Sequence, residues 1–515
     1  MNRIVVLCAA CVAAVVFFHG PAVAQAEQRD SSYELALESI QTETVREHVA
    51  FLADDAQEGR EAGSRGGRAC GDYLARQFDR MGLEPAGVEG YFQPFPNRCR
   101  NVLARLPGSD PQLANEIILV GAHYDHVGLG ASNNSRGRPG EIHNGADDNA
   151  SGTSGMLELA EAFSLLAERP KRTILFVAWD GEEKGMLGSK HFAAHPTVPI
   201  DNIAMVFNLD MIGRMQNDTV YVFGTRSGFG LRRALAECNP GFELVFDWTT
   251  MPNADHWPLF DRGIPYLMFH TGKHPQYHTQ DDDAARLDHE GIRRLTRFVF
   301  ATMYDLAQSP RVPGFRAAAR HENNWMRGQW TASGAPPAPR LGVRWREPAG
   351  ADEGVQLTSV QDGTPAAAAR LQPGDRILRL GGRDVHSGDE LRQAVFHASG
   401  PTPLVVHRPA EPEPRTLTAE LPRQQLRVGV TWRVDTASPG TVVLTQVLPG
   451  SPAAAAGLLA GDRIYQVAGR DFADENEFAD RLKHLPGPIE LLVERQGRLE
   501  TIVVRLDATF LDRAA

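Results

Sequence analysis

The chain has 515 residues, of which 42% are hydrophobic and 23% are charged. This ordinary composition excludes collagen-like, disordered and wholly membrane-embedded proteins, and the length indicates about three domains. Lys and Arg total 53 against 64 Asp and Glu, which gives a net charge of −11. Because no basic run interrupts this acidic balance, we expect no nucleic-acid partner.

The first 26 residues have the pattern of an export signal. Arg3 precedes an apolar run over 4–18, and residues 22–24 have the small side chains that a signal peptidase accepts. The apolar run is shorter than a membrane span of about 20 residues. We therefore expect a signal peptide over 1–26, a periplasmic or secreted protein, and no stable membrane span after cleavage.

Three cysteines follow the signal: Cys70, Cys99 and Cys238. Three are too few for a disulfide scaffold. An oxidising compartment would allow one pair to form, and Cys70 with Cys99 is the nearer pair in sequence. The sequence leaves that disulfide open.

Residues 32–308 alternate short apolar runs with amphipathic stretches such as 154–168. The apolar runs cover 117–120, 173–179, 203–209 and 265–269. Short continuous apolar runs are typical of strands buried on both faces. Strands that alternate with helices predict an α/β fold, with a mainly parallel mixed sheet flanked by helices.

Residues 309–338 are rich in Pro, Gly, Ala and Arg and lack any periodicity, which predicts a linker. An internal repeat follows. Residues 363–378 recur at 450–465, an offset of 87, and the same offset relates Leu341-Gly342-Val343 to Val428-Gly429-Val430. This constant offset predicts two copies of one small domain, over 339–421 and 426–508.

Both repeats resemble the PDZ domain in three motifs: Leu/Val-Gly-Val, Gly-Thr/Ser-Pro-Ala-Ala and Gly-Asp-Arg-Ile. The resemblance implies two small β-rich domains that take an extended peptide or protein C-terminus as an added strand. The terminal carboxylate would be held by backbone N–H groups of 340–343 and 427–430. The alternative is that the repeats serve as a rigid spacer or as a cap.

Histidines and carboxylates follow the four apolar runs of the first unit. They are His123 and Asp125, Glu182 and Glu183, Asp210, and His278, with Asp147 and Asp148 ahead of a predicted helix. The carboxyl ends of parallel strands meet at one edge of a sheet, so we expect these side chains to lie together. So many carboxylates would repel each other unless cations are bound.

His with Asp and Glu, and no Cys, suits a catalytic zinc site. The ligands exceed what one tetrahedral ion needs, which favours two ions that share a carboxylate. Each piece alone has an ordinary explanation: Glu182-Glu183 could be a solvated loop, and Asp147-Asp148 could cap a helix. Their combination at strand ends makes those explanations improbable.

The first unit resembles peptidase family M28 over roughly 40–308. The matching motifs are His123-Tyr-Asp125, Gly145-Ala-Asp147-Asp148-Asn-Ala-Ser-Gly152, Glu182-Glu183, Asn208-Leu-Asp210-Met-Ile and Tyr277-His278-Thr. The resemblance implies the zinc exopeptidase fold and two Zn²⁺ per chain. One ion would be held by His123 and Asp210, and the other by Glu183 and His278.

The same resemblance implies roles for three further residues. Asp147 would bridge the two ions, Glu182 would act as the general base, and Asp125 would orient His123. One segment departs from the family pattern: Ala254 replaces a usual Ser, and residues 251–253 lack the Tyr that assists the oxyanion in some members. The oxyanion donor therefore stays open.

These features predict an exported zinc aminopeptidase that acts on peptides with a free N-terminus. The alternatives are a dipeptidase or carboxypeptidase of the same family, or a catalytically weak PDZ scaffold. A single-zinc glutaminyl cyclase is disfavoured by the complete ligand set, and the retained Glu182 argues against a scaffold. Because no candidate ligand lies beyond 283, we also expect the peptidase unit to work on small substrates without the repeats.

Overall fold

The computed structural model describes residues 31–131, 133–250, 252–331, 340–346, 354–422 and 426–506. The expected signal peptide over 1–26 lies outside these ranges. Among the residues that the structure describes, no helix is both long enough and apolar enough to cross a bilayer. Cys70 and Cys99 form no disulfide with each other in the structure.

The N-terminal unit is built on one mixed sheet, in the order β1-β3-β5-β4-β6-β9-β7-β8 with β2 beside β3. Its strands are β1 (Glu84–Pro85), β2 (Phe92–Phe95), β3 (Cys99–Leu106), β4 (Ile117–His123), β5 (Thr173–Trp179), β6 (Ile203–Leu209), β7 (Thr219–Phe223), β8 (Glu243–Asp247) and β9 (Tyr266–His270). The central strands β5, β4, β6 and β9 run parallel, as predicted. Strand β3 joins β5 antiparallel, and β7 joins β9 antiparallel.

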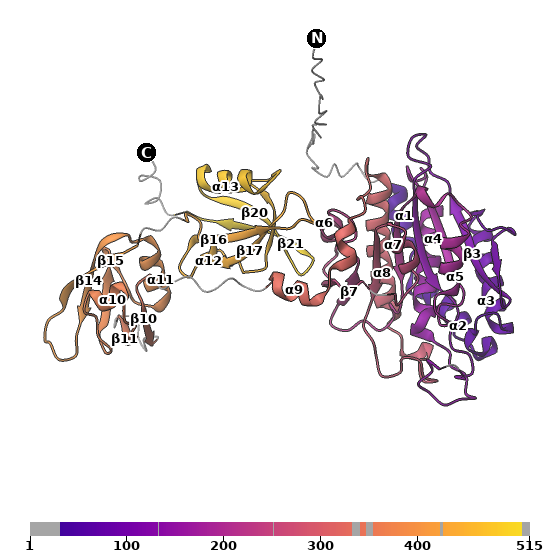
Figure 1. Cartoon of the computed structure of the whole chain (residues 1–515), viewed down its shortest axis with the longest axis horizontal. Coiled ribbons are helices and arrows are strands. Elements are labelled where there is room, and N and C mark those ends of the chain that lie inside the picture. The colour runs from indigo at the N-terminus through magenta and orange to yellow at the C-terminus, as the bar shows by residue number, and fades with distance from the viewer. Residues whose placement is uncertain are drawn as a thin grey trace, which may run out of the picture.

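Both faces of this sheet are buried, which explains the continuous apolar runs in the sequence. In β5, Ile174 and Phe176 face one hydrophobic core, whereas Leu175 and Val177 face the other. The first core is covered by α1 (Ser31–Ser39), α2 (Thr42–Leu52), α3 (Arg65–Arg80), α4 (Gly152–Ser164), α6 (Leu231–Cys238) and α8 (His289–Gln308). The second core is covered by α5 (Leu187–Ala194) and α7 (Trp257–Asp261). The predicted α/β fold is confirmed (Figure 1).

Four short helical segments that are not α-helices connect these elements: η1 (Asp55–Arg60), η2 (Ala146–Ser151), η3 (Ile200–Asn202) and η4 (Ala284–Arg286). The long helix α8 has a polar cap, because the Asp288 side chain accepts a hydrogen bond from the Gly291 N–H at 2.9 Å. Its apolar face packs on α4 and into the first core. The sheet is thereby held rigidly beneath the loops that leave its carboxyl edge.

The two repeats fold as separate β-rich units with the same strand order, which confirms the predicted duplication. The first contains β10 (Val343–Arg346), β11 (Val355–Val360), β12 (Arg376–Leu380), β13 (Arg383–Asp384), β14 (Gly400–His407), β15 (Arg415–Leu421), α10 (Pro365–Ala368) and α11 (Gly388–His397). The second contains β16 (Val430–Val434), β17 (Val442–Val447), β18 (Arg463–Val467), β19 (Arg470–Asp471), β20 (Ile489–Arg495), β21 (Arg498–Val504), α12 (Pro452–Ala455) and α13 (Glu475–His484). Each unit has its own hydrophobic core.

The glycine of the Leu/Val-Gly-Val motif is required by backbone geometry in both repeats. Gly342 and Gly429 each have φ of +84°, in the left-handed region. A Cβ at Gly342 would lie 2.3 Å from Thr364, and one at Gly429 would lie 2.1 Å from Ser451. The motif therefore marks a tight turn that leads into edge strands β10 and β16.

The described part of the expected linker packs against the N-terminal unit. Its described part, 309–331, contains η5 (Ala317–His321) and α9 (Asn324–Thr331). Phe315 packs on Phe260 with ring centroids 5.6 Å apart, and so anchors this segment in the second core. Figure 1 shows the second repeat, in yellow, between the N-terminal unit and the first repeat.

Candidate metal centre and active site

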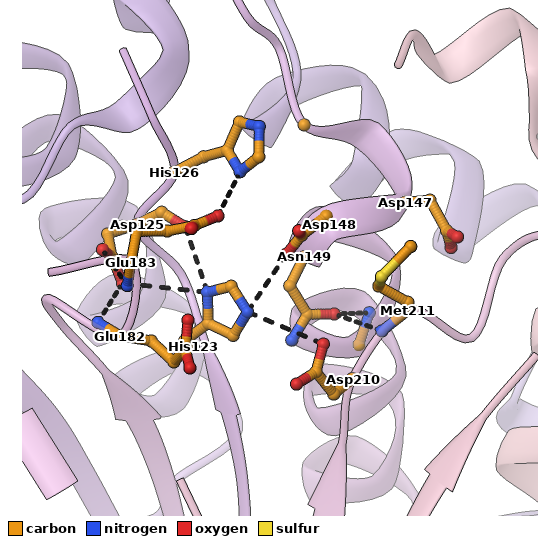
Figure 2. Close-up of polar contacts among 12 residues, drawn as sticks. His123, Asp125, His126, Asp147, Asp148, Asn149, Glu182, Glu183, Asp210 and Met211 are labelled. Atoms are coloured by element: carbon orange, nitrogen blue, oxygen red, sulfur yellow. Dashed lines mark hydrogen bonds and ion pairs between the residues drawn. The ribbon is translucent and has the colours of Figure 1, made fainter. Parts of the chain in front are cut away.

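The carboxyl ends of the parallel strands bring the expected side chains to one place. His123 is the last residue of β4, and Asp210 follows β6 directly. Glu182 and Glu183 lie in the loop after β5, and His278 lies in the loop after β9. Figure 2 shows His123 between the Glu182-Glu183 loop and Asp210.

Asp148, in η2, lies between two groups of possible metal ligands. Its Oδ1 is 3.2 Å from Nε2 of His123, and its Oδ2 is 2.9 Å from Nε2 of His278. Ligand atoms of His123, Asp148 and Asp210 lie within 4.8 Å of one another, and the same holds for His126, Asp148 and Glu183. One carboxylate is thus shared by both groups.

The predicted bridge, Asp147, is not part of either group. Its Oδ1 accepts hydrogen bonds from the Gly213 N–H at 2.6 Å and the Ser151 hydroxyl at 3.1 Å. Its Oδ2 lies 3.2 Å from Nε2 of His274, on the side away from His123. Figure 2 shows Asp147 apart from the cluster. This corrects the sequence-based assignment: Asp148 has the bridging position, and Asp147 fastens the turn behind it.

His278 presents one ring nitrogen to the site. Its Nδ1 lies 2.8 Å from the backbone carbonyl of Asn134, which leaves Nε2 facing Asp148 and, at 3.3 Å, Oε2 of Glu183. The Asn134 amide also donates to Oε2 of Glu183 at 2.7 Å. Nδ1 of His126 lies 2.7 Å from the other Glu183 oxygen. Both oxygens of Glu183 therefore have fixed directions.

Asp125 and Asn149 belong to neither ligand group, but they position residues that do. The Asp125 carboxylate accepts the N–H groups of Glu182 at 3.0 Å and Glu183 at 3.3 Å, and lies 3.8 Å from Nδ1 of His123. Asn149 donates to the Leu209 carbonyl at 2.9 Å and accepts from the Met211 N–H at 3.2 Å. Because Leu209 and Met211 flank Asp210, Asn149 fixes the direction in which Asp210 points.

The site concentrates negative charge in a buried place. Burial raises the pKa of Glu182 well above its ordinary value; His123 opposes this shift and Asp255 adds to it. Burial disfavours a charged His123, but contact with Asp148 and Asp210 raises its pKa well above the usual range. A bound cation would therefore favour the deprotonated forms of both Glu182 and His123.

The donor set fits zinc. Every member of the two groups is an imidazole or a carboxylate, and these are zinc ligands in catalytic sites. Within the described residues, Nε2 of His126 is buried without a hydrogen-bond partner. The arrangement can hold two cations on opposite sides of Asp148.

The structure adds three residues to those predicted from sequence. Asp148 belongs to the quoted motif, but the pair Asp147-Asp148 gave no sign of which carboxylate faces the site. His126 follows His123 by three residues, and this spacing of two histidines after a buried strand was a sign that His126 lies near the site. Tyr277 stacks on His278 with ring centroids 3.8 Å apart, and burial together with the site carboxylates raises the pKa of its hydroxyl.

Comparisons with known proteins match three parts of the chain to family models. Residues 101–303 match the model of Peptidase family M28. Residues 339–407 and 443–495 match two models of the PDZ domain.

Curated relatives are zinc metalloproteases and aminopeptidases. A probable zinc metalloprotease of Pyrenophora teres f. teres is 30% identical over 196 residues, which are 36% of this chain and 38% of that protein. Aminopeptidase YwaD of Bacillus subtilis is 30% identical over 212 residues, which are 38% of this chain and 43% of that protein. The chain therefore spans about two fifths of the length of these relatives.

A solved structure resembles about half of the chain. The LapA aminopeptidase of Legionella pneumophila aligns with a TM-score of 0.46 and 21% identity, over 54% of this chain and 75% of that one.

Proposed function

Because the chain contains a domain of peptidase family M28 followed by two PDZ domains, we propose that it is an exported dizinc aminopeptidase. The observation that carries the proposal is the shared position of Asp148 between two ligand groups. The amino-acid pattern of 1–26 supports export to the periplasm or the exterior.

The proposed ligands divide evenly about Asp148. His123 and Asp210 would hold one ion on one side of Asp148. Glu183 would hold the other together with His278, whose Nε2 lies 2.9 Å from Asp148 and 3.3 Å from Glu183. His126 directs Glu183 through its 2.7 Å contact. When bound there, two zinc ions supply a Lewis acid for the scissile carbonyl and lower the pKa of a water molecule towards 7.

Glu182 is the proposed proton carrier. Its backbone N–H is fixed by Asp125, and its side chain stands beside His123 without belonging to either ligand group. It can accept the proton of the attacking water and deliver it to the leaving amine. The adjacent Glu183 is engaged by His126, Asn134 and His278, so the two glutamates have different tasks.

A free N-terminus is the expected substrate requirement. An α-ammonium group is attracted by the surplus of buried carboxylates in this site, and acetylation removes its charge. We expect free aminoacyl peptides to be cleaved at least about 100-fold faster than their acetylated forms, as a lost charge contact of roughly 3 kcal/mol implies. The measurement compares kcat/KM for matched pairs of peptides.

The same assay separates the alternatives. Equal rates on acetylated peptides, with release of C-terminal residues, would indicate a carboxypeptidase, and activity limited to dipeptides would indicate a dipeptidase. If the zinc-loaded protein hydrolyses none of these peptides, the remaining alternative is a catalytically weak PDZ scaffold. Peptide or protein C-termini are the proposed ligands of the PDZ domains.

Tyr277 is the proposed hydrogen-bond donor to the oxyanion. Some members of the family use a tyrosine at the position of residues 251–253 for this role, but this sequence has none there. Burial keeps its hydroxyl protonated, and its pKa is raised further by the carboxylates of Asp148 and Glu183. We expect Tyr277→Phe to lower kcat by about 10- to 100-fold with little change in KM, since Phe keeps the ring and removes one donor. Steady-state kinetics at wild-type zinc content would measure this, and an unchanged kcat would contradict the role.

A further inference from the structure

The second PDZ domain is fastened to the peptidase domain by a largely buried ion network. Arg226 donates to Asp435 at 2.7 Å, and Arg232 binds both oxygens of Glu494 at 2.8 and 2.9 Å. Arg463 of the same PDZ domain lies 2.7 Å from Asp435. Beside this core, Arg233 binds both oxygens of Asp471 at 3.0 Å.

Backbone contacts extend the surface. The Leu244 N–H of β8 donates to the Gln496 carbonyl at 2.9 Å, and the Gly230 N–H donates to the Ala437 carbonyl at 2.8 Å. Figure 1 shows the turn between β20 and β21 reaching the region of α6. Asp435 and Glu494 are both nearly inaccessible to solvent, so the contact excludes water from its charges.

The repeat offset explains why only the second domain docks. Asp435 and Glu494 correspond to Pro348 and His407 in the first PDZ domain. The first domain therefore lacks two of the three carboxylates that the peptidase arginines bind, and it keeps only Asp384, at the position of Asp471. Two copies of one fold have acquired different surfaces.

This docked surface leads directly to the segment that follows β8. The Arg226 guanidinium lies 4.0 Å from the ring centre of Trp248 and also binds Glu322 of the ordered linker. Asn324 of α9 accepts the Trp248 N–H at 3.0 Å and donates to Asp247 at 2.8 Å and Thr249 at 2.9 Å. Residues 247–249 are thus held by the linker and, through Arg226, by the second PDZ domain.

The same segment ends beside the catalytic centre. Asp255 is 1% exposed and accepts a hydrogen bond from Ser189, in the helix after the Glu182-Glu183 loop. His256 stacks on Tyr266 of β9 with ring centroids 4.1 Å apart. Trp248 is therefore close in sequence to Asp255, a carboxylate whose charge acts on Glu182.

We infer that the second PDZ domain and α9 act as a built-in clamp on residues 247–249, so that domain docking sets the catalytic efficiency of the peptidase site. This inference rests on the proposed aminopeptidase function for its activity readout only. It reverses the expectation that both repeats are separable from the chemistry, and leaves the first PDZ domain as the module that is free of the peptidase domain.

The test breaks the docking surface in the full-length chain. Asp471→Arg places a cation against Arg233, and Arg233→Asp breaks the same pair from the other side without altering the PDZ sequence. The charge swap that combines both variants should restore the pair. Asp384→Arg is the matched control, because Asp384 is the equivalent residue of the first PDZ domain and pairs only locally with Arg379.

Hydrogen–deuterium exchange over 244–256, zinc content and steady-state kinetics are measured for each variant. Both single variants should speed exchange across this segment and lower kcat/KM by about 3- to 10-fold at wild-type zinc content. The swap should recover both values, and Asp384→Arg should change neither. Asn324→Ala, which leaves the PDZ surface intact, should reproduce the faster exchange.

Two results would overturn the inference. In one, exchange over 489–498 shows that the domain has detached while 248–256 and kcat/KM stay at wild-type values. In the other, neither single variant loosens the docked surface. If the wild-type enzyme shows no aminopeptidase activity, the proposed function fails. Hydrogen–deuterium exchange over 244–256 then still tests whether docking restrains this segment.

Discussion

Glu182→Gln is expected to lower kcat on aminoacyl substrates by about 10²- to 10⁴-fold, the usual contribution of a general base. Gln keeps the size of the side chain and the backbone contact with Asp125, but it cannot accept a proton. Glu182 belongs to neither ligand group, so the zinc content and the fold should be unchanged. The measurements are steady-state kinetics and elemental analysis of the same preparation.

The neighbouring residue provides the matched control. Glu183→Gln should weaken metal binding, because both Glu183 oxygens face site residues: His126 at 2.7 Å and His278 at 3.3 Å. A base and a ligand are thereby distinguished by one property, the zinc retained after dialysis. Near wild-type turnover by Glu182→Gln would assign proton transfer to another group.

Asp148→Asn is expected to reduce zinc binding at both positions, by at least about 100-fold in affinity. The change removes the only carboxylate common to both groups, and even residues behind the ligands cost about 10- to 100-fold when altered. The wild-type protein should bind two zinc ions per chain. Competition with a chromophoric chelator and elemental analysis would give the affinity and the stoichiometry.

Asp147→Asn is the control for this experiment. Its Oδ1 can still accept from the Gly213 N–H, and neither of its oxygens belongs to the ligand groups. We expect two ions to remain bound with affinity within about tenfold of wild type. Loss of both ions in Asp147→Asn, with Asp148→Asn unaffected, would return the bridge to Asp147.

The sequence predicted most of the site because the signal was local. Strands buried on both faces read as continuous apolar runs, and their carboxyl ends mark where His123, Asp210 and the Glu182-Glu183 pair emerge. The choice between Asp147 and Asp148 was not local. Adjacent side chains in a turn point in different directions, and their direction depends on Gly213, His274 and His278, which are distant in sequence.

What the sequence determined by itself is the α/β unit, the duplication at a constant offset of 87 residues, and the chemical type of the site. Each follows from periodicity or spacing within one stretch of chain. Only the tertiary structure decided that the second repeat lies against the first unit and that part of the linker is bound there. Those contacts join Arg226 to Asp435 and Arg232 to Glu494, 209 and 262 residues apart. Charged surface residues show no periodic pattern in the sequence. Their pairing is therefore defined only when the folded domains contact each other.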